Sequence, residues 1–340
     1  MAARAFITGL AGFEIAATER AFLREAQPWG LIIFKRNVKS PEQLTALVAS
    51  FRDIVGWQAP VLIDQEGGRV QRLGPPFWPA YPAGARYGEL YDREPATGLA
   101  AARLGGHLIA ADLKVLGIDV DCLPLADVPA AGGDPIIGDR AYGTEPGKVA
   151  ALAGAVAEGL LAGGVLPVLK HLPGHGRATA DSHLKLPVVD TDRKTLERTD
   201  FAAFRPLAHL PLGMTAHVVF SAIDPVAPAT TSVTMVREVI RDFIGFAGAL
   251  MSDDVSMGAL SGSLAERSTA ALAAGCDLVL HCNGDLAEMT AVAGATPMLS
   301  GEAARRCEAA LNQRRAPEDF DIEAARHLFN ETLAQRKLVS

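Results

Sequence analysis

Short apolar runs alternate with longer stretches of helical periodicity along the chain of 340 residues. Short runs that end at Gly, Pro or charged residues are typical of buried strands, whereas apolar residues three or four positions apart are typical of helices. We expect strands at Phe6–Thr8, Gly30–Phe34, Val61–Asp64, Asp119–Leu123, Val165–Lys170, Gly213–His217, Ala249–Asp253 and Asp277–His281. We expect helices at Pro41–Val55, Leu99–Leu116, Lys148–Ala162, Val233–Phe246 and Leu264–Ala274.

This alternation predicts an α/β fold, a (β/α)8 TIM-type barrel, which needs roughly 250 residues or more. A doubly wound sheet is the competing fold, but no Gly-x-Gly-x-x-Gly turn follows the first strand. Gly301–Arg314 and Asp321–Lys337 are expected to be C-terminal helices that close the barrel. No repeat or Gly/Ser-rich linker divides the sequence, so we expect a single domain over residues 1–340.

Charge and hydropathy exclude two broad classes. The net charge is −7 and no block of Lys and Arg is present, which argues against a nucleic-acid-binding protein. No apolar run reaches the roughly 18 residues of a membrane helix, and no secretory signal is visible. The four cysteines form no CxxC pair and are expected to be core thiols. These features predict a cytoplasmic protein without nucleic-acid or membrane partners.

Several predicted strands end in polar residues. These strand ends are Asp64, Lys170-His171, His217, Ser252-Asp253 and His281. One such residue alone would be explained by a salt bridge or a helix cap. Because the carboxyl ends of barrel strands surround a common pocket, five of them together favour one active site.

The densest polar segment follows the strand expected at Val165–Lys170. Residues 170–183 contain three of the eight histidines, together with Lys170 and Asp181, around a Pro-Gly turn. A metal-dependent hydrolase is one interpretation, with ligands drawn from His171, His175, Asp181, His183, His217 and Asp253. Against it, the first strand supplies no His-x-His pair, and two histidines across a Pro-Gly turn are a poor chelate.

Retaining glycoside hydrolysis is the second interpretation. It requires a carboxylate nucleophile, a proton donor and polar groups that bind sugar hydroxyls. Asp253 at a strand end can serve as the nucleophile, and Asp181 can orient His183 as a proton donor. The remaining polar candidates, which suit hydroxyl binding but would also suit rim ion pairs, are Asp64, Arg72, Arg140, Lys170 and His171.

Four motifs in order resemble the β-N-acetylglucosaminidases of glycoside hydrolase family 3, in particular the short cytoplasmic enzymes of peptidoglycan recycling. They are Asp64–Arg72 (DQEGGRVQR), Ile137–Arg140 (IGDR), Lys170–Gly176 (KHLPGHG) with Asp181-Ser182-His183, and Ser252–Met257 (SDDVSM). The segment Trp29–Leu44 is similar as well, and the likeness extends from about residue 7 to residue 285.

The resemblance implies a role for each matching residue. Asp253 would form the covalent glycosyl-enzyme intermediate, and His183 would be the general acid/base with Asp181 as its partner. The residues that would bind N-acetylglucosamine are Asp64, Arg72, Arg140, Lys170 and His171. The implied enzyme is an exo-acting monomer without cofactor or metal, and it removes terminal N-acetylglucosamine from anhydromuropeptides.

The sequence departs from the family at two positions and leaves two histidines undecided. Leu172 replaces a usual phenylalanine, which is expected to loosen the wall near the sugar, and Arg177 stands where an acidic residue is common. His175 and His217 fit site wall and structural support equally, and Asp254 is expected to be structural. A β-glucosidase of the same family and a non-catalytic sugar-binding barrel remain alternatives. The chain's own Asp-Ser-His and its nucleophile argue against both.

Overall fold

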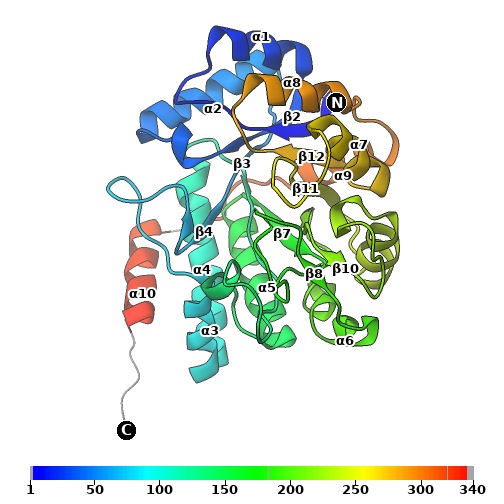
Figure 1. Cartoon of the computed structure of the whole chain (residues 1–340). Helices are drawn as coiled ribbons and strands as arrows, with labels where there is room; N and C mark the ends of the chain where they lie inside the picture. Colours follow the sequence, from blue (N-terminus) through cyan, green and yellow to red (C-terminus); the bar gives the residue numbers. More distant parts are fainter. Residues whose placement is uncertain (1–2, 183, 320, 335–340) are drawn as a thin grey trace.

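The computed structural model describes residues 3–182, 184–319 and 321–334. Eight parallel strands form a closed barrel in the order β1-β12-β11-β9-β7-β6-β3-β2, and helices surround it (Figure 1). The barrel strands are β1 (Arg4–Thr8), β2 (Pro28–Ile33), β3 (Val61–Ile63), β6 (Val120–Asp121), β7 (Leu166–Leu172), β9 (Leu212–Thr215), β11 (Ala249–Asp254) and β12 (Leu278–His281). The predicted (β/α)8 barrel is confirmed, and each expected strand overlaps an observed one.

The helices follow the strands in chain order. They are α1 (Ala17–Ala26), α2 (Pro41–Val55), α3 (Gly84–Arg93), α4 (Pro95–Lys114), α5 (Pro146–Ala162), α6 (Arg193–Arg198), α7 (Leu264–Ala274), α8 (Leu286–Ala295), α9 (Gly301–Leu311) and α10 (Ile322–Ala334). Short 3₁₀ turns are η1 (Lys35–Asn37), η2 (Gly138–Arg140), η3 (Phe201–Ala203), η4 (Arg205–Leu207) and η5 (Ala229–Thr231). The helix expected at Val233–Phe246 is a π-helix, η6 (Met235–Phe243).

Local sequence explains where α2 begins and ends. The Oγ of Ser40 accepts a hydrogen bond from the amide of Gln43 at 3.2 Å, and Pro41 occupies the first helical position, where its missing N–H costs nothing. Gly56 ends the helix with a φ of 77°, a left-handed conformation that glycine adopts without steric cost. The predicted start and end of this helix are therefore confirmed.

Two small sheets lie outside the barrel and were not predicted. One is the hairpin of β4 (Gln65–Gly67) and β5 (Val70–Gln71), and the other pairs β8 (Val188–Val189) with β10 (Val219–Phe220). The hairpin begins directly after β3, so it directs the polar residues that follow Ile63 over the carboxyl end of the barrel. Its strands are too short to give a readable alternation of apolar and polar residues.

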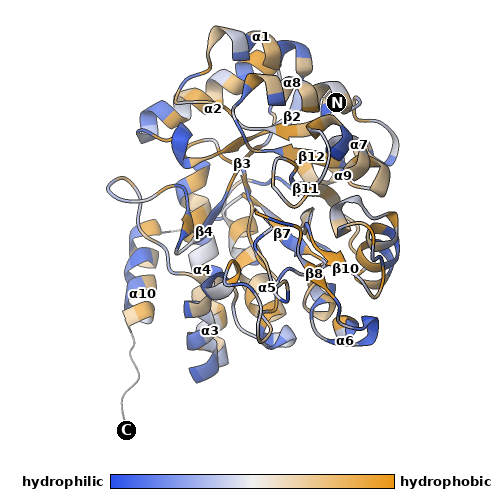
Figure 2. Cartoon of the chain, in the orientation of Figure 1, coloured by the Kyte–Doolittle hydropathy of each residue, from blue (hydrophilic) through white to orange (hydrophobic). Residues whose placement is uncertain are grey.

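Apolar side chains fill the barrel interior and the layer between barrel and helices. The barrel strands are coloured as hydrophobic in Figure 2, whereas α6 and the far end of α3 are hydrophilic. Within the barrel lie Ile7, Ile32, Leu62, Val168 and Met251, among others. The four cysteines are buried and free, as predicted.

The two C-terminal helices pack at different places. Cys307 and Ala310 of α9 join the apolar cluster of the barrel interior, so α9 covers the end of the barrel where the strands begin. Helix α10 packs beside α4, and its Phe329 ring lies 6.3 Å from that of Tyr81. Both expected closing helices are confirmed, although the end expected at Lys337 lies outside the described residues.

Candidate active site

A cavity of about 210 Å³ opens at the carboxyl ends of the barrel strands. It is smaller than the pockets of ~300–1,000 Å³ that hold drug-sized ligands, and it suits a single sugar ring. Its polar lining consists of Asp64, Glu66, Arg72, Arg140, Lys170, His171, His175, Ser182 and Asp253. Its apolar lining consists of Ile32, Val70, Ile136, Ile137, Met214, Leu280 and Cys282. The five predicted sugar-binding residues and the predicted nucleophile therefore meet in one cavity.

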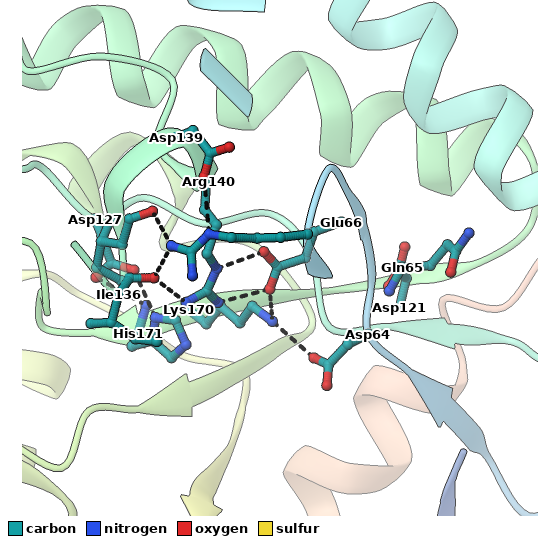
Figure 3. Close-up of polar contacts among 12 residues, drawn as sticks. Asp64, Gln65, Glu66, Asp121, Asp127, Ile136, Asp139, Arg140, Lys170 and His171 are labelled. Atoms are coloured by element: carbon teal, nitrogen blue, oxygen red, sulfur yellow. Dashed lines mark hydrogen bonds and ion pairs between the residues drawn. The ribbon is translucent and has the colours of Figure 1, made fainter. Parts of the chain in front are cut away.

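A network of buried charges forms one side of this cavity (Figure 3). The Nζ of Lys170 lies 3.0 Å from Asp64 Oδ1 and 2.6 Å from Glu66 Oε1. Arg72 donates to Asp64 Oδ2 at 2.7 Å. Arg140 donates to both carboxylate oxygens of Glu66, at 2.9 and 2.8 Å. Only 2% of the Lys170 side chain is exposed, so its ion pairs are not the rim pairs considered from sequence, whereas 24% of the Arg72 side chain is exposed.

The network keeps its members ionised. Burial alone would raise the pKa of Asp64, but Lys170 and Arg72 outweigh it and hold this pKa well below its usual value. Lys170 and Arg140 lower the pKa of Glu66 in the same way against its burial. Burial opposes the charge on Lys170, yet the two carboxylates raise its pKa. The result is a fixed set of charged hydrogen-bond donors and acceptors on one side of the cavity.

His171 extends from the end of β7 toward the same cavity. Its Nδ1 lies 2.7 Å from Asp127 Oδ2, and the Asp127 side chain is fully buried. Burial opposes the charge of Asp127, but the neighbouring His171 and the amide of His175 lower the pKa of this carboxyl overall. Asp127 is thus a charged partner behind the wall of the cavity.

Asp253 stands near the end of β11 and faces the cavity. Its Oδ1 accepts the amide of Asp254 at 2.8 Å, and among the described residues it has no Lys or Arg partner within 4 Å. Burial disfavours its charge, but His217 and His171 outweigh that cost and lower the pKa of Asp253. An ionised carboxylate without a cation on its oxygens is available for attack on a bound ligand.

Asp254 turns to different partners. Its Oδ1 accepts the amides of Ser256 at 3.0 Å and Cys282 at 3.2 Å, and its Oδ2 accepts the hydroxyl of Ser256 at 2.7 Å. These bonds tie the loop after β11 to the end of β12. The contacts of Asp254 are therefore those of structural support.

The loop after β7 reaches back over the cavity. His175 Nε2 lies 3.0 Å from Ser182 Oγ, and both side chains are buried. Burial and the adjacent His171 lower the pKa of His175 to about 4, so its ring is neutral at pH 7. Asp181 lies on this loop in a partly buried position, whereas the predicted acid/base His183 lies outside the described residues.

The two other strand-end histidines have structural contacts. His217 is fully buried, and its ring lies 2.7 Å from Thr230 Oγ1 and 3.0 Å from the Asp254 carbonyl. His281 Nε2 lies 3.1 Å from Glu288. Neither His217 nor His281 is among the described residues that line the cavity. The expectation that every polar strand end faces the pocket is therefore wrong for these two, and of the undecided pair only His175 belongs to the wall.

The two departures from the family pattern lie away from the sugar-sized space. Leu172 is fully buried in the main apolar core, and within the described chain it is not among the cavity residues. The expectation that it loosens the wall is therefore wrong. Arg177 contacts Asp200 at 2.9 Å and Thr199 at 3.3 Å, so it anchors the loop after β7 to the segment after α6.

Sequence reasoning missed Glu66 and Asp127. Glu66 stands inside the recognised segment Asp64–Arg72, and its two cationic partners are far away in sequence. Asp127 follows an apolar segment after β6 and belongs to none of the four motifs. An acidic residue within a long apolar stretch was the available signal, because a buried carboxylate requires a partner.

Within residues 3–182, 184–319 and 321–334, no group of three or more His, Cys, Asp and Glu side chains has a metal-holding arrangement. No helix in these ranges is both long enough and apolar enough to span a bilayer.

Comparison with known proteins assigns the family. Residues 4–312 match the family model of the glycosyl hydrolase family 3 N-terminal domain. A protein named beta-hexosaminidase from Alkalilimnicola ehrlichii is 42% identical over 279 residues, which cover 81% of this chain and 79% of that protein. Another beta-hexosaminidase, from Aromatoleum aromaticum, is 34% identical and aligns over 92% of this chain and 89% of its own length.

Solved structures agree with this assignment. The crystal structure of NagZ from Neisseria gonorrhoeae has a TM-score of 0.85 and 30% identity, and the match covers 98% of this chain and 97% of that one. A family 3 beta-N-acetylglucosaminidase from Paenibacillus has a TM-score of 0.86 and 28% identity, over 96% of this chain and 66% of that longer chain. The predicted family is confirmed: the chain belongs to glycosyl hydrolase family 3 and is a glycoside hydrolase.

Proposed function

We propose that the protein is a retaining, exo-acting β-N-acetylglucosaminidase. The observation that carries this proposal is Asp253, an ionised carboxylate without a cationic partner among the described residues, beside a cavity sized for one sugar. A cavity that holds one ring favours removal of a terminal residue. A relative supports N-acetylglucosamine as the sugar that is bound, because one structure of NagZ from Neisseria gonorrhoeae is a complex with N-trifluoroacetyl-D-glucosamine.

The proposed reaction has two displacement steps. An oxygen of Asp253 attacks the anomeric carbon while the bond to the leaving oxygen breaks, and His183 gives that oxygen a proton. A water molecule then attacks the glycosyl ester, His183 accepts its proton, and Asp253 is released. Two substitutions at the same carbon restore the original configuration, so the released sugar is the β-anomer.

The charge network holds the sugar during both steps. Asp64, Arg72, Arg140, Lys170 and His171 are proposed to bind its hydroxyl groups, because all five line the cavity and four belong to the rigid ionic network. Binding groups that are already oriented before substrate arrives need little reorganisation in the transition state. Asp181 is proposed to orient His183, as the resemblance implies.

The natural substrates are proposed to be anhydromuropeptides released during peptidoglycan recycling. This rests on the resemblance and on the NagZ-type relatives. A cytoplasmic location, a monomeric state and a single functional domain are part of the same proposal. Family 3 β-glucosidase, sugar-binding protein and metal-dependent hydrolase are the competing outcomes of the test below.

The first experiment compares hydrolysis of the 4-nitrophenyl β-glycosides of N-acetylglucosamine and of glucose, each with and without EDTA. Strong preference for the N-acetyl substrate, with the β-anomer as first product by NMR, supports the proposal. Preference for glucose contradicts the substrate, loss of activity with EDTA supports a metal-dependent enzyme, and no turnover of either supports a binding protein. Greater kcat/KM for a GlcNAc-anhydroMurNAc peptide than for chitobiose would support the natural substrate.

Two variants test the residue roles. Asp253→Ala should lower kcat by about 10⁵-fold, because it removes the proposed nucleophile. His183→Ala should affect a substrate with a good leaving group less than one with a poor leaving group, because the former needs less protonation. Asp92→Ala is the control, since Asp92 is an exposed residue of α3. Near wild-type activity of Asp253→Ala would refute the nucleophile, and equal losses for both substrates would refute the acid.

A further inference from the structure

Asp127 is a buried carboxylate just outside the cavity. It follows β6 in a segment joined to β7, since the amide of Ala126 donates to the Lys170 carbonyl at 2.8 Å. Its side chain is 0% exposed, so it does not contact a bound sugar. It nevertheless receives hydrogen bonds from the backbone or side chain of both histidines in the Lys170–Gly176 segment.

Its first contact determines the state of the His171 ring. Oδ2 of Asp127 lies 2.7 Å from His171 Nδ1. An ionised carboxylate only accepts hydrogen bonds, so Nδ1 must carry a proton. When the ring is neutral, Nε2 is therefore an acceptor and can receive a sugar hydroxyl. Figure 3 shows Asp127 and His171 next to the ionic network.

Its second contact fixes the turn that carries His175. Oδ1 of Asp127 accepts the amide of His175 at 2.6 Å and, more weakly, that of His171 at 3.4 Å. The same carboxylate thus holds both ends of the Leu172-Pro173-Gly174 turn. The rings of His171 and His175 lie edge to face, with their centroids 5.9 Å apart.

From His175 the connection continues to the loop that contains the predicted acid. The His175 ring contacts the hydroxyl of Ser182 at 3.0 Å, and Ser182 lies between Asp181 and His183 in the sequence. The Ser182 carbonyl accepts the amide of Ala259 at 3.1 Å, six residues after Asp253. One buried carboxylate is therefore connected to the sugar-binding wall and to the loop over it.

We propose that Asp127 is a positioning residue that sets the His171 tautomer and the placement of the loop containing Asp181 and Ser182. The inference rests on the proposed function for its kinetic consequence, but its structural part concerns the His171 ring alone. It gives Asp127 a role for which the sequence motifs provide no indication. Loss of the His171 contact should therefore weaken sugar binding, whereas the contact with the His175 amide holds the loop.

The test is Asp127→Asn, which keeps the shape and removes the charge. The backbone N–H of His175 cannot lose its proton, so the amide oxygen should face it and the amide NH₂ should face His171. The ring should then shift its proton from Nδ1 to Nε2. ¹⁵N NMR of labelled histidine at pH 8 measures this, with the His171 signals identified by their loss in His171→Gln.

The expected result is an Nδ1-protonated His171 in the wild type and an unprotonated Nδ1 in Asp127→Asn. We also expect kcat/KM for the N-acetylglucosaminide to fall by about 100-fold, a typical effect of losing an orienting partner, for good and poor leaving groups alike, because the Asn oxygen still accepts the His175 amide. Asp92→Asn, the same change on the surface, should alter neither. The same tautomer in wild type and variant would overturn the proposal.

The design separates the two proposals. If the wild type hydrolyses no N-acetylglucosaminide, the proposed function fails, whereas the NMR result still decides the role of Asp127. If the wild type is active and Asp127→Asn retains full kcat/KM for good and poor leaving groups alike, only the positioning role fails. A folded variant is verified by its thermal unfolding before either measurement.

Discussion

Clusters of buried charge lie at both ends of the barrel, and their surroundings differ. At the end where the strands begin, Asp277 contacts Arg241 at 2.9 Å and Arg306 at 3.0 Å, and its Oδ2 accepts the amide of Leu250. Asp119 is similar, since it contacts Arg52 at 3.2 Å and Arg314 at 2.9 Å. At the opposite end, the network around Lys170 borders a cavity.

The two sets of buried ion pairs differ in what surrounds them, and the proposed function assigns them two purposes in one barrel. The ion pairs of Asp277 and Asp119, at the end where the strands begin, are covered by α9 and the segment after it. Helix α9 supplies Arg306, and the following segment supplies Arg314. Their oxygens are used by protein donors, so they fasten the C-terminal segment beneath the strands. The network around Lys170, at the opposite end, has the same chemistry, but its groups face a space that a ligand can enter. We expect position in the barrel, not the type of pair, to separate stability from function.

Lys170→Met should have the largest effect, because it removes the cation shared by Asp64 and Glu66. We expect kcat/KM to fall by about 10³-fold and the free energy of unfolding to fall by about 3 kcal/mol, since two buried carboxylates lose a partner. Kinetics and chemical denaturation measure the two losses. Lys194→Met, at an exposed position of α6, is the control. Unchanged kcat/KM would remove the functional half of the comparison.

Asp277→Asn should destabilise the protein without altering catalysis. Two arginines lose a buried carboxylate, which is expected to cost about 3 kcal/mol of unfolding free energy. The site lies at the opposite barrel end, so kcat/KM at 25 °C should stay within about twofold of wild type. Asp285→Asn keeps the cap of α8 and serves as a matched surface change. A tenfold loss of kcat/KM in the folded variant would show that the two ends are coupled.

A smaller effect is the pH dependence of the free energy of unfolding, which His175 introduces at the cavity end of the barrel. The pKa of His175 is about 4 in the folded protein and about 6.5 in an unfolded chain, so the unfolded state takes up the proton first. Stability should therefore fall as the pH decreases from about 6.5 toward 4, by at most about 3 kcal/mol from this ring. Comparing denaturation of wild type and His175→Gln at pH 7 and pH 5 measures its share.

The matched control for this measurement is His209→Gln, because His209 is exposed. The free energy of unfolding of His209→Gln should depend on pH as in the wild type, whereas that of His175→Gln should depend on pH more weakly. The same dependence in His175→Gln and wild type would mean that protonation of this ring is not opposed by its surroundings. Asp277→Asn changes no histidine, so the difference in its free energy of unfolding between pH 7 and pH 5 should equal that of the wild type.

Much of this fold was readable from local sequence. Each expected barrel strand overlaps an observed strand, because parallel strands covered on both faces have continuous apolar runs. The start of α2 was readable from Ser40 and Pro41. The hairpin of β4 and β5 was missed because its strands are short. The π-helical winding of η6 was missed because apolar periodicity does not show to which carbonyl each amide donates its hydrogen bond.

By itself, the sequence determined the family, the barrel and the group of polar residues that follows the strands. The tertiary structure decided which of these residues share the cavity. It turned His217 and His281 toward Thr230 and Glu288, and it brought Asp127 to His171 from 44 positions away. The physical reason is that a strand end fixes where a residue lies, whereas burial requires each polar group to find partners that only the folded chain brings within reach.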